Sequence, residues 1–345
     1  MTIDEVIAGV PAWAGLDVLV ESIEGGLTNA NYRLTAGDER FCVRIPGRDS
    51  SLLAVDRRAE HLNTLAAAAA GVGAAVRYTV GDEQFCVRIP GRDSSLLAVD
   101  RRAEHQNTLA AAEAGVGAHV VHTVGDEPVM VLEWITGEVQ DAESLHRDGA
   151  VEQIAASVRR LHAGPRFGNS FDMFRIQQRY RAICAEHAFR IPGDYDDHEP
   201  VVRRIEQAMA LQGADLVPCN NDLLAANYIA TPAGFRIIDY EYAGMNDPCF
   251  ELGNTVAESK LGHERLERLI ELYFGAPLRN RVARAHLWAA MANYGWTLWA
   301  CIQREVSDID FDFWAWGVDD KYARAVVAFT GPELEGWLAD VRRSD

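Results

Sequence analysis

Two hydrophobic patterns divide the chain. Up to about residue 135, short runs of β-branched and aromatic residues alternate with turn residues, which is typical of strands. The turn sequence Thr-x-Gly-Asp-Glu occurs at 35–39, 79–83 and 123–127, each time between β-prone flanks, as in hairpins. The third turn leads into the apolar run 128–134, which predicts a buried strand. We expect a mostly antiparallel sheet of about five or more strands in this part.

Beyond about residue 150, the apolar positions recur at helical spacing instead. A sheet-rich region followed by a helical region predicts an α+β fold with two parts, residues 1–135 and 136–345. The helices are expected at 150–164, 174–187, 198–212, 260–274, 278–305 and 318–342.

The N-terminal part contains a tandem duplication. Residues 37–80 and 81–124 are identical at 38 of 44 positions, and each copy predicts a turn, a strand, a loop and an Ala-rich helix. Two copies are too few for a solenoid, and no later segment continues the period. We therefore expect both copies to belong to one lobe.

Composition narrows the function classes. The 345 residues are 48% hydrophobic and 24% charged, as in soluble globular proteins. A net charge of −18 and a pI near 5.0 disfavour nucleic acid or an anionic membrane as a partner. The N-terminus resembles no signal peptide, and the longest apolar run, 65–76, is too short to span a bilayer. Six cysteines without metal spacing indicate free thiols, so we expect a cytoplasmic protein.

Two polar motifs in the second half carry the candidate chemistry. Four residues separate Asp222 from Asn227, and Asp239 follows twelve positions after Asn227, at the end of an apolar run. This is the layout in which kinases hold a catalytic base and the ligands of Mg²⁺. The turn at 231–234 predicts a hairpin that returns Asp239 to Asn227. A solvated turn before a buried strand would explain one motif alone, but the combination favours phosphoryl transfer.

A glycine turn in the N-terminal part is a candidate phosphate loop. Residues 22–34 predict a strand, a turn with two glycines and a second strand. Backbone amides in such a turn approach phosphates closely because glycine lacks a side chain. The candidate contacts are Gly26, Thr28 and Asn29, and an ordinary hairpin is the alternative.

Each duplicated block also offers a cation for the nucleotide. The strand Phe-Cys-Val-Arg-Ile contains Arg44 in the first copy and Arg88 in the second. Glu60 or Glu104 follows sixteen residues later on the predicted helix, as in the strand-cation and helix-Glu pair of kinases. The alternative is an edge strand whose Arg faces water. Since Arg44 follows the glycine turn closely, we predict Arg44 with Glu60 as the working pair, and the second copy as an insertion on the exterior. The alternative is Arg88 with Glu104, because the second predicted helix runs directly into the hairpin built on Gly125.

Four segments resemble the bacterial branch of the choline/ethanolamine kinase family, which belongs with the aminoglycoside phosphotransferases. The resemblance covers about residues 20–330, apart from the extra copy. It implies a protein-kinase-like bilobal fold, with an N-terminal nucleotide-binding lobe and a helical catalytic lobe. The segments that carry it are GGLTN at 25–29, CVRIPG at 42–47, CNNDLL at 219–224 and IDYEYAGMNDP at 238–248.

The resemblance also implies roles and cofactors. Asp222 would be the catalytic base, Asn227 and Asp239 the Mg²⁺ ligands, and the backbone from Glu133 to Ile135 the hinge that binds the adenine of ATP. The chain departs from the family at Asn220, where a structural His is usual. That departure affects the geometry of the loop more than catalysis.

Aromatic residues near the C-terminus suggest the acceptor. A trimethylammonium group donates no hydrogen bond, so proteins hold it with aromatic faces and a carboxylate. Similarity to the choline site of the family points to Trp296, Trp299 and Trp316, with Glu241 and Tyr242 from the Asp239 motif. Helix packing is the alternative for tryptophans three residues apart.

The sequence therefore predicts an ATP- and Mg²⁺-dependent kinase that phosphorylates a small amino-alcohol, choline before ethanolamine. The alternatives are a kinase of aminoglycosides or other small-molecule hydroxyls, and an inactive nucleotide-binding pseudokinase. The aromatic cluster disfavours the open acidic groove of an aminoglycoside site. The intact Asp222, Asn227 and Asp239 disfavour the pseudokinase. Neither nucleic acid nor a membrane is an expected partner.

Overall fold

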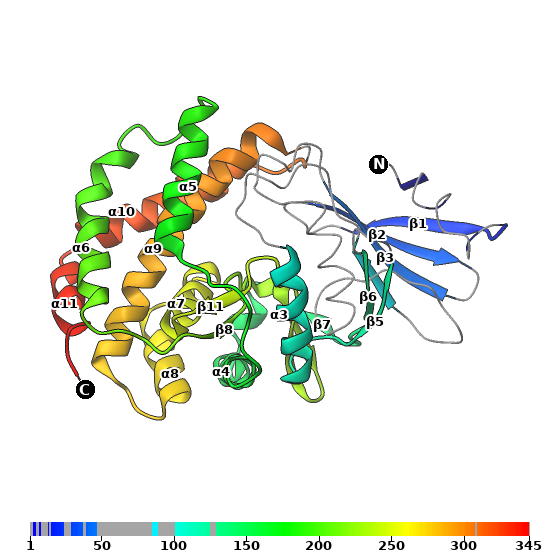
Figure 1. Cartoon of the computed structure of the whole chain (residues 1–345), viewed down its shortest axis with the longest axis horizontal. Coiled ribbons are helices and arrows are strands. Elements are labelled where there is room, and N and C mark those ends of the chain that lie inside the picture. The colour runs from blue at the N-terminus through cyan, green and yellow to red at the C-terminus, as the bar shows by residue number, and fades with distance from the viewer. Residues whose placement is uncertain are drawn as a thin grey trace.

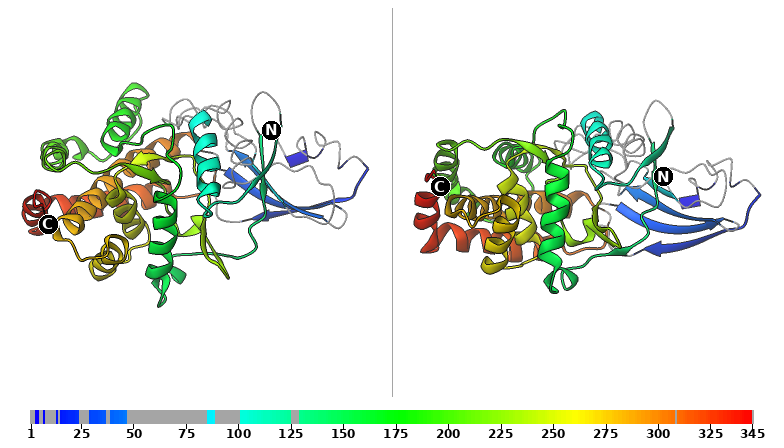
Figure 2. Two further views of the ribbon diagram at one scale, coloured as in Figure 1. Left: turned by 60° about the horizontal axis from the view of Figure 1, so that its bottom comes forward. Right: turned by 90° about the horizontal axis from the view of Figure 1, so that it is seen from below.

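A strand-rich lobe and a helical lobe make up the molecule, and helix α3 (Arg101–Glu113) lies between them in all three views (Figures 1 and 2). This arrangement confirms the predicted bilobal α+β fold. In the described part of the chain, no helix is both long enough and apolar enough to cross a membrane. The structure, a computed structural model, describes residues 3–4, 7, 13, 15–23, 29–36, 39–46, 85–88, 101–124, 129–307 and 309–344.

The strand-rich lobe contains a six-stranded sheet in the order β1-β2-β3-β4-β6-β5. Neighbouring strands pair antiparallel, except β3 and β4, which are parallel. The predicted sheet is therefore confirmed. Its strands are β1 (Val18–Ile23), β2 (Asn29–Ala36), β3 (Glu39–Pro46), β4 (Phe85–Arg88), β5 (Val120–Val124) and β6 (Val129–Glu133).

The duplicated strands lie side by side. Phe41 pairs with Phe85 and Arg44 with Arg88, so the two copies align residue for residue. Strand β4 also pairs with β6, which places the second copy inside the sheet. The prediction that this copy packs on the exterior is wrong. An identical strand has the same tendency to pair, and the chain between the two strands exceeds the dozen or so residues that a parallel crossover needs.

Helix α3 of the second copy is anchored to the helical lobe. Ala110 and Ala111 belong to that lobe's hydrophobic core. Beyond the helix, the carbonyl of Val116 accepts hydrogen bonds from the Ile237 amide and the Arg236 side chain, both at 3.0 Å. The second copy therefore connects the sheet to the segment that precedes Asp239.

The helical lobe agrees with five of the six predicted helices to within a few residues. The sixth, 318–342, is divided into a π-helical segment and two short helices, and Gly331 and Pro332 separate the two short helices. The helices are α4 (Ala150–His162), α5 (Met173–Glu186), α6 (Glu199–Ala210), α7 (Pro248–Glu258), α8 (His263–Phe274), α9 (Arg279–Val306), the π-helix Ala315–Tyr322, α10 (Ala323–Thr330) and α11 (Glu333–Asp340).

Helix α7 was missing from the prediction. It begins with Asp247, whose side chain accepts the Cys249 amide at 2.9 Å, and with Pro248 in the first turn. Both are helix-start signals, so the sequence contained the information. Two small sheets complete the lobe: β7 (Glu138–Val139), β9 (Tyr228–Thr231) and β10 (Gly234–Ile237) form one, and β8 (Val217–Cys219) and β11 (Gly244–Asn246) form the other.

The contact between α7 and α9 generates a stability prediction. A Cβ atom at Gly253 would collide with the backbone carbonyl of Ala285, which cannot rotate away. We expect Gly253→Ala to destabilise the protein by about 1–3 kcal/mol, as overpacking usually does. In the control Gly336→Ala, the added methyl meets nothing, and helix propensity favours Ala. Thermal unfolding followed by circular dichroism measures both, and equal melting temperatures would contradict the prediction.

Candidate active site

The loop after β8 and the hairpin β9–β10 bring the predicted catalytic residues together. A 3₁₀ turn, Ala225–Asn227, leads from the loop into β9. Strand β10 pairs antiparallel with β9, and the amide of Ile238 donates to the carbonyl of Asn227 at 2.9 Å. The predicted hairpin is therefore confirmed. Since Asp239 follows Ile238 directly, its backbone lies next to that of Asn227.

Asn220 connects the loop to the Asp239 segment. Its Oδ1 accepts the amide of Asp222 at 3.0 Å, and its Nδ2 donates to the carbonyl of Asp239 at 2.7 Å. One amide side chain can make both bonds because it carries an acceptor and two donors. Asn220 thus fixes the loop geometry at the position where the family usually has His.

Asn221 makes a second connection of the same kind. Its Nδ2 donates to the carbonyl of Tyr242 at 2.9 Å, and its Oδ1 accepts from Asn246 at 2.8 Å. Asn221 has a φ of 67° and Asp239 a φ of 63°, in the left-handed region that Asn and Asp tolerate better than other side chains. The two motifs therefore require these residue types for their backbone as well as for their chemistry.

A buried carboxylate holds the loop by accepting hydrogen bonds from its backbone. Glu251 of α7 accepts the backbone amides of Asn220 at 2.9 Å and Asn221 at 2.8 Å. His162 of α4 lies with Nε2 3.0 Å from the same carboxylate and with Nδ1 2.7 Å from the hydroxyl of Tyr273. His162 is therefore a structural residue with both ring nitrogens satisfied. No feature of the local sequence pointed to Glu251.

His162 and Glu251 also form a compact group with Cys219. Their potential ligand atoms all lie within 4.8 Å of one another, close enough for one metal ion. Within the described ranges, no other set of three or more His, Cys, Asp or Glu residues meets this condition. Burial, and then the charge of Glu251, raise the pKa of the Cys219 thiol well above its usual value. Because the thiol stays protonated and Glu251 is bonded to loop amides, the group serves as a structural support.

The charge around Asp222 is strongly negative. Burial raises the pKa of Asp222 well above its usual value, and the carboxylates of Glu258, Asp239 and Glu241 raise it further. The ammonium of Lys321 opposes this shift. Neighbouring cations, such as a divalent metal ion or a cationic acceptor, would stabilise the ionised Asp222.

Asn227 and Asp239 have the donor chemistry that a hard cation requires. Mg²⁺ prefers carboxylate and amide oxygens. The Nδ2 of Asn227 donates to the carbonyl of Asp222 at 2.7 Å, which leaves its Oδ1 to face a cation. The residues therefore fit the predicted ion.

The predicted nucleotide contacts are only partly within the described chain. Gly26, Thr28 and Glu60 lie outside the described residues. Asn29 begins β2, and Arg44 and Arg88 lie in the adjacent strands β3 and β4. Glu104 lies in α3 and is buried.

The predicted hinge, from Glu133 to Ile135, follows strand β6, which pairs with β4. Glu133 ends β6, and Ile135 lies in the connection to the helical lobe. The side chain of Glu133 accepts the His119 amide at 3.0 Å and pairs with Arg236 at 3.6 Å. Of the two duplicated strands, β4 is the one adjacent to this hinge.

The predicted aromatic cluster surrounds Tyr242. Trp299 donates from Nε1 to the Tyr242 hydroxyl at 3.0 Å, and Trp296 meets the Tyr242 ring edge to face at 5.1 Å. Trp316 packs edge to face on Trp299 at 5.6 Å. Trp296 and Trp299 are buried members of the hydrophobic core as well. The cluster therefore contributes to packing and also adjoins the Asp239 segment.

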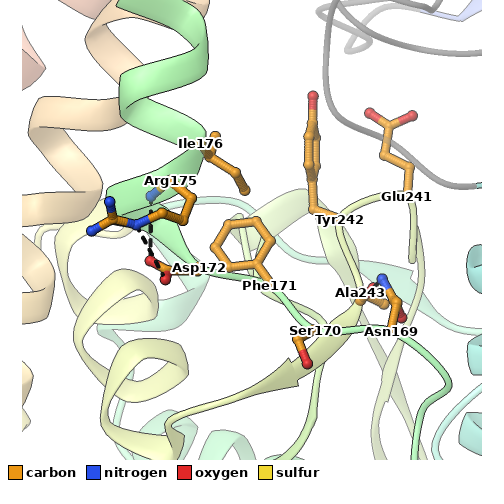
Figure 3. A pocket seen from close by; sticks show the side chains of 9 residues that line it. All are labelled: Asn169, Ser170, Phe171, Asp172, Arg175, Ile176, Glu241, Tyr242 and Ala243. Atoms are coloured by element: carbon orange, nitrogen blue, oxygen red, sulfur yellow. Dashed lines mark hydrogen bonds and ion pairs between the residues drawn. The ribbon is translucent and has the colours of Figure 1, made fainter.

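A pocket of about 260 Å³ opens beside Glu241 and Tyr242. Figure 3 shows the Glu241 carboxylate and the Tyr242 hydroxyl pointing to the same side, with Phe171 near the Tyr242 ring. The sequence gave no signal for the wall that the 169–176 segment contributes. The lining residues are Asn169, Ser170, Phe171, Asp172, Arg175, Ile176, Glu241, Tyr242 and Ala243.

A mostly antiparallel sheet lobe, a helical lobe, and Asp222, Asn227 and Asp239 on the helical lobe are together typical of kinase-like phosphotransferases. The family model of the phosphotransferase enzyme family, APH, matches residues 20–292, and the chain belongs to this family. The resemblance to this superfamily is therefore confirmed.

Two of the three curated relatives described here are named as kinases of small molecules. Ethanolamine kinase 2 of Rattus norvegicus is 31% identical over 147 residues, which are 34% of this chain and 38% of the relative. Thiamine kinase of Salmonella paratyphi B is 27% identical over 173 residues, 48% of this chain and 58% of the relative. LicA of Haemophilus influenzae is 26% identical over 132 residues, 37% of this chain and 49% of the relative. The chain thus spans about half the length of the curated relatives it matches.

Similar solved structures extend over nearly the whole chain. A choline/ethanolamine kinase family protein from Mesorhizobium loti has a TM-score of 0.73 and 28% identity, covering 99% of both chains. Choline kinase LicA from Streptococcus pneumoniae has a TM-score of 0.67 and 22% identity, covering 95% of this chain and 97% of that one. At this lower identity the second likeness concerns the fold alone.

The raised pKa of Asp222 predicts that its charge lowers stability. The carboxyl of Asp222 binds a proton more readily in the folded protein than in the unfolded chain. The charged carboxylate therefore lowers the free energy of unfolding above the raised pKa, and this destabilisation disappears below the usual pKa of 3.8. Without nucleotide or divalent cation, we expect Asp222→Asn to melt at a higher temperature than the parent at about pH 8 and equally at about pH 3.

The matched control is Asp247→Asn. Asp247 forms a buried ion pair with Arg284 and accepts Trp288 Nε1 at 2.8 Å. Removing its charge leaves a buried cation unpaired, so we expect a loss of about 3–5 kcal/mol. If Asp222→Asn destabilised the protein at the higher pH, the assigned electrostatics would be incorrect.

Proposed function

We propose that this protein transfers the γ-phosphate of ATP, with Mg²⁺, to the hydroxyl group of a small amino-alcohol. The observation that carries the proposal is the convergence of Asp222, Asn227 and Asp239, which Asn220 fixes through two hydrogen bonds. The names of the relatives, ethanolamine kinase and LicA choline kinase, support this acceptor class.

Each side chain has a role that its chemistry supports. Asp222 orients the acceptor hydroxyl and accepts its proton, for which a raised pKa brings a carboxylate closer to neutral pH. Asn227 and Asp239 hold Mg²⁺, which neutralises charge on the phosphates when bound. Most of the rate enhancement comes from positioning the hydroxyl against the phosphate.

The acceptor is a cation in this proposal. Glu241 and the rings of Tyr242 and Phe171 line the pocket, whereas Trp296, Trp299 and Trp316 do not line it and are connected to it through their contacts with Tyr242. Aromatic faces attract ammonium groups by about 0.5–2 kcal/mol each. If all these aromatic faces were available to the acceptor, choline would be favoured over ethanolamine. Lys321, however, already lies over the Trp316 ring.

For the nucleotide, we propose that the second copy supplies the working pair, Arg88 with Glu104. Strand β4 adjoins the hinge strand β6, whereas β3 is one strand further away. Asn107, one turn after Glu104, donates to the carbonyl of Ala243 at 2.9 Å, close to the Asp239 motif. This arrangement argues against the pair from the first copy. Gly26, Thr28, Asn29 and the backbone from Glu133 to Ile135 remain the proposed phosphate and adenine contacts.

Thiamine is a second candidate acceptor. The match to thiamine kinase extends over 48% of this chain, and thiamine also combines a hydroxyethyl group with a permanent positive charge. The structure of an aminoglycoside 2'-phosphotransferase-IIIa shares the fold, with a TM-score of 0.54. The aromatic surroundings of Tyr242 favour a smaller acceptor.

An acceptor panel tests the proposed function. We expect ADP release from ATP and Mg²⁺ to depend on ethanolamine or choline, and to be weaker with thiamine or kanamycin. Asp222→Asn should lower turnover by about 10²–10⁴-fold, the usual contribution of a general base, while ATP binding persists. Asp215→Asn, at an exposed loop position, is the control. Full activity of Asp222→Asn, or turnover with no amino-alcohol, would refute the proposal.

The duplication offers a matched pair of variants for the nucleotide site. We expect Arg88→Ala to raise the KM for ATP about 10–100-fold, because a charge-assisted hydrogen bond is lost. Arg44→Ala removes the same residue type from the neighbouring strand and should change KM less than about threefold. Steady-state kinetics at saturating acceptor measures both. The reverse order of effects would restore the first copy as the working one.

A further inference from the structure

Lys321 is a buried lysine beside the candidate acceptor site. It lies in the π-helical segment Ala315–Tyr322 and is 1% exposed. Its Nζ donates to Oε1 of Glu258 and lies 4.2 Å from the centre of the Trp316 ring. An ammonium over an aromatic face and against a carboxylate is a complete cation-binding arrangement.

This position is continuous with the aromatic cluster. Trp316 packs against Trp299, whose indole nitrogen donates to the Tyr242 hydroxyl. The charges of Lys321 and Glu258 also reach Asp222, since Lys321 lowers the pKa of that carboxyl and Glu258 raises it. The lysine thus occupies a cation position next to the proposed base.

The backbone around Lys321 is held tightly. Gly317 lies so close to α9 that a Cβ atom there would collide with the Cβ of Ala300. The hydroxyl of Tyr322 donates to Asp194 at 2.8 Å. Arg324 donates to the carbonyl of Ala257 at 2.6 Å, one residue before Glu258. Lys321 therefore has little freedom to leave its place when an acceptor binds.

We propose that Lys321 is a specificity-determining residue, whose ammonium fills the Trp316–Glu258 cation position and so selects acceptors bearing N–H groups over quaternary ammonium acceptors. The inference rests on the proposed amino-alcohol function and specifies its acceptor. It places ethanolamine-like primary amines before choline.

The selectivity follows from how each ammonium is bound. A quaternary ammonium donates no hydrogen bond and depends on aromatic faces, one of which Lys321 already covers. A primary ammonium can instead donate to a carboxylate, and Glu241, which Lys321 does not occupy, lines the pocket. Displacing Lys321 to admit a trimethylammonium group would leave a buried lysine without its carboxylate, which is unfavourable.

Calorimetric titration with small cations tests the inference without ATP or turnover. We expect the parent protein to bind methylammonium more tightly than tetramethylammonium. In Lys321→Ala, truncation uncovers Trp316 and Glu258, and the affinity for tetramethylammonium should rise at least about tenfold. Lys321→Met removes the charge but fills the space, so it should show no comparable gain. The double variant Lys321→Ala with Glu258→Gln should lose the gain.

Two results would overturn the inference. One is a folded Lys321→Ala protein, verified by near-ultraviolet circular dichroism, that binds tetramethylammonium no better than the parent. The other is a parent protein that prefers tetramethylammonium, which decides the matter even if Lys321→Ala does not fold. Because neither measurement involves phosphoryl transfer, absence of turnover in the acceptor panel would refute the proposed function separately.

Discussion

The geometry of the site depends on hydrogen bonds that hold a short loop to the segment after strand β10. Asn220 and Asn221 use their side chains to bind the backbone of Asp239 and Tyr242, while Glu251 accepts both of their amides. Three consecutive polar residues, Asn220 to Asp222, would be costly to bury without these partners. The same bonds that satisfy the buried backbone therefore also set the separation of the functional groups. The positions of the proposed catalytic residues and the stability of the loop therefore depend on the same hydrogen bonds.

The sequence revealed the parts of this network that are close along the chain. The spacing from Asp222 to Asp239 predicted the hairpin because turn residues and an apolar strand lie between them. Glu251 and His162 were not predicted as a support, since they are 89 residues apart and only tertiary packing brings them together. The tryptophans of α9 were predicted from similarity to the choline site of the family. The ammonium over Trp316, by contrast, depends on a π-helical segment whose irregular spacing is not visible in a sequence pattern.

The duplicated block shows a different limit of sequence reasoning. Two nearly identical strands have the same propensity, so the choice of the first copy as the working one was based on local closure. In the structure, it is the strand of the second copy, β4, that pairs with β6, the strand before the predicted hinge. Some of the six differences agree with this outcome: Gln106 and Glu113 are exposed on α3, where the first copy has Leu62 and Ala69.

The parallel pairing of β3 with β4 has a consequence for solubility. The duplicated strand β4 runs in the same direction as β3 and pairs with it inside the sheet. The additional strand therefore widens the sheet by one interstrand spacing of about 4.8 Å. The outermost strands of the described sheet are β1 and β5, and neither contains a duplicated copy of the Phe-Cys-Val-Arg run. An unpaired outer strand is where sheets recruit other chains and aggregate. Because β4 lies between β3 and β6, the additional strand did not create a new edge of the described sheet. This position explains how the fold can tolerate a whole additional strand.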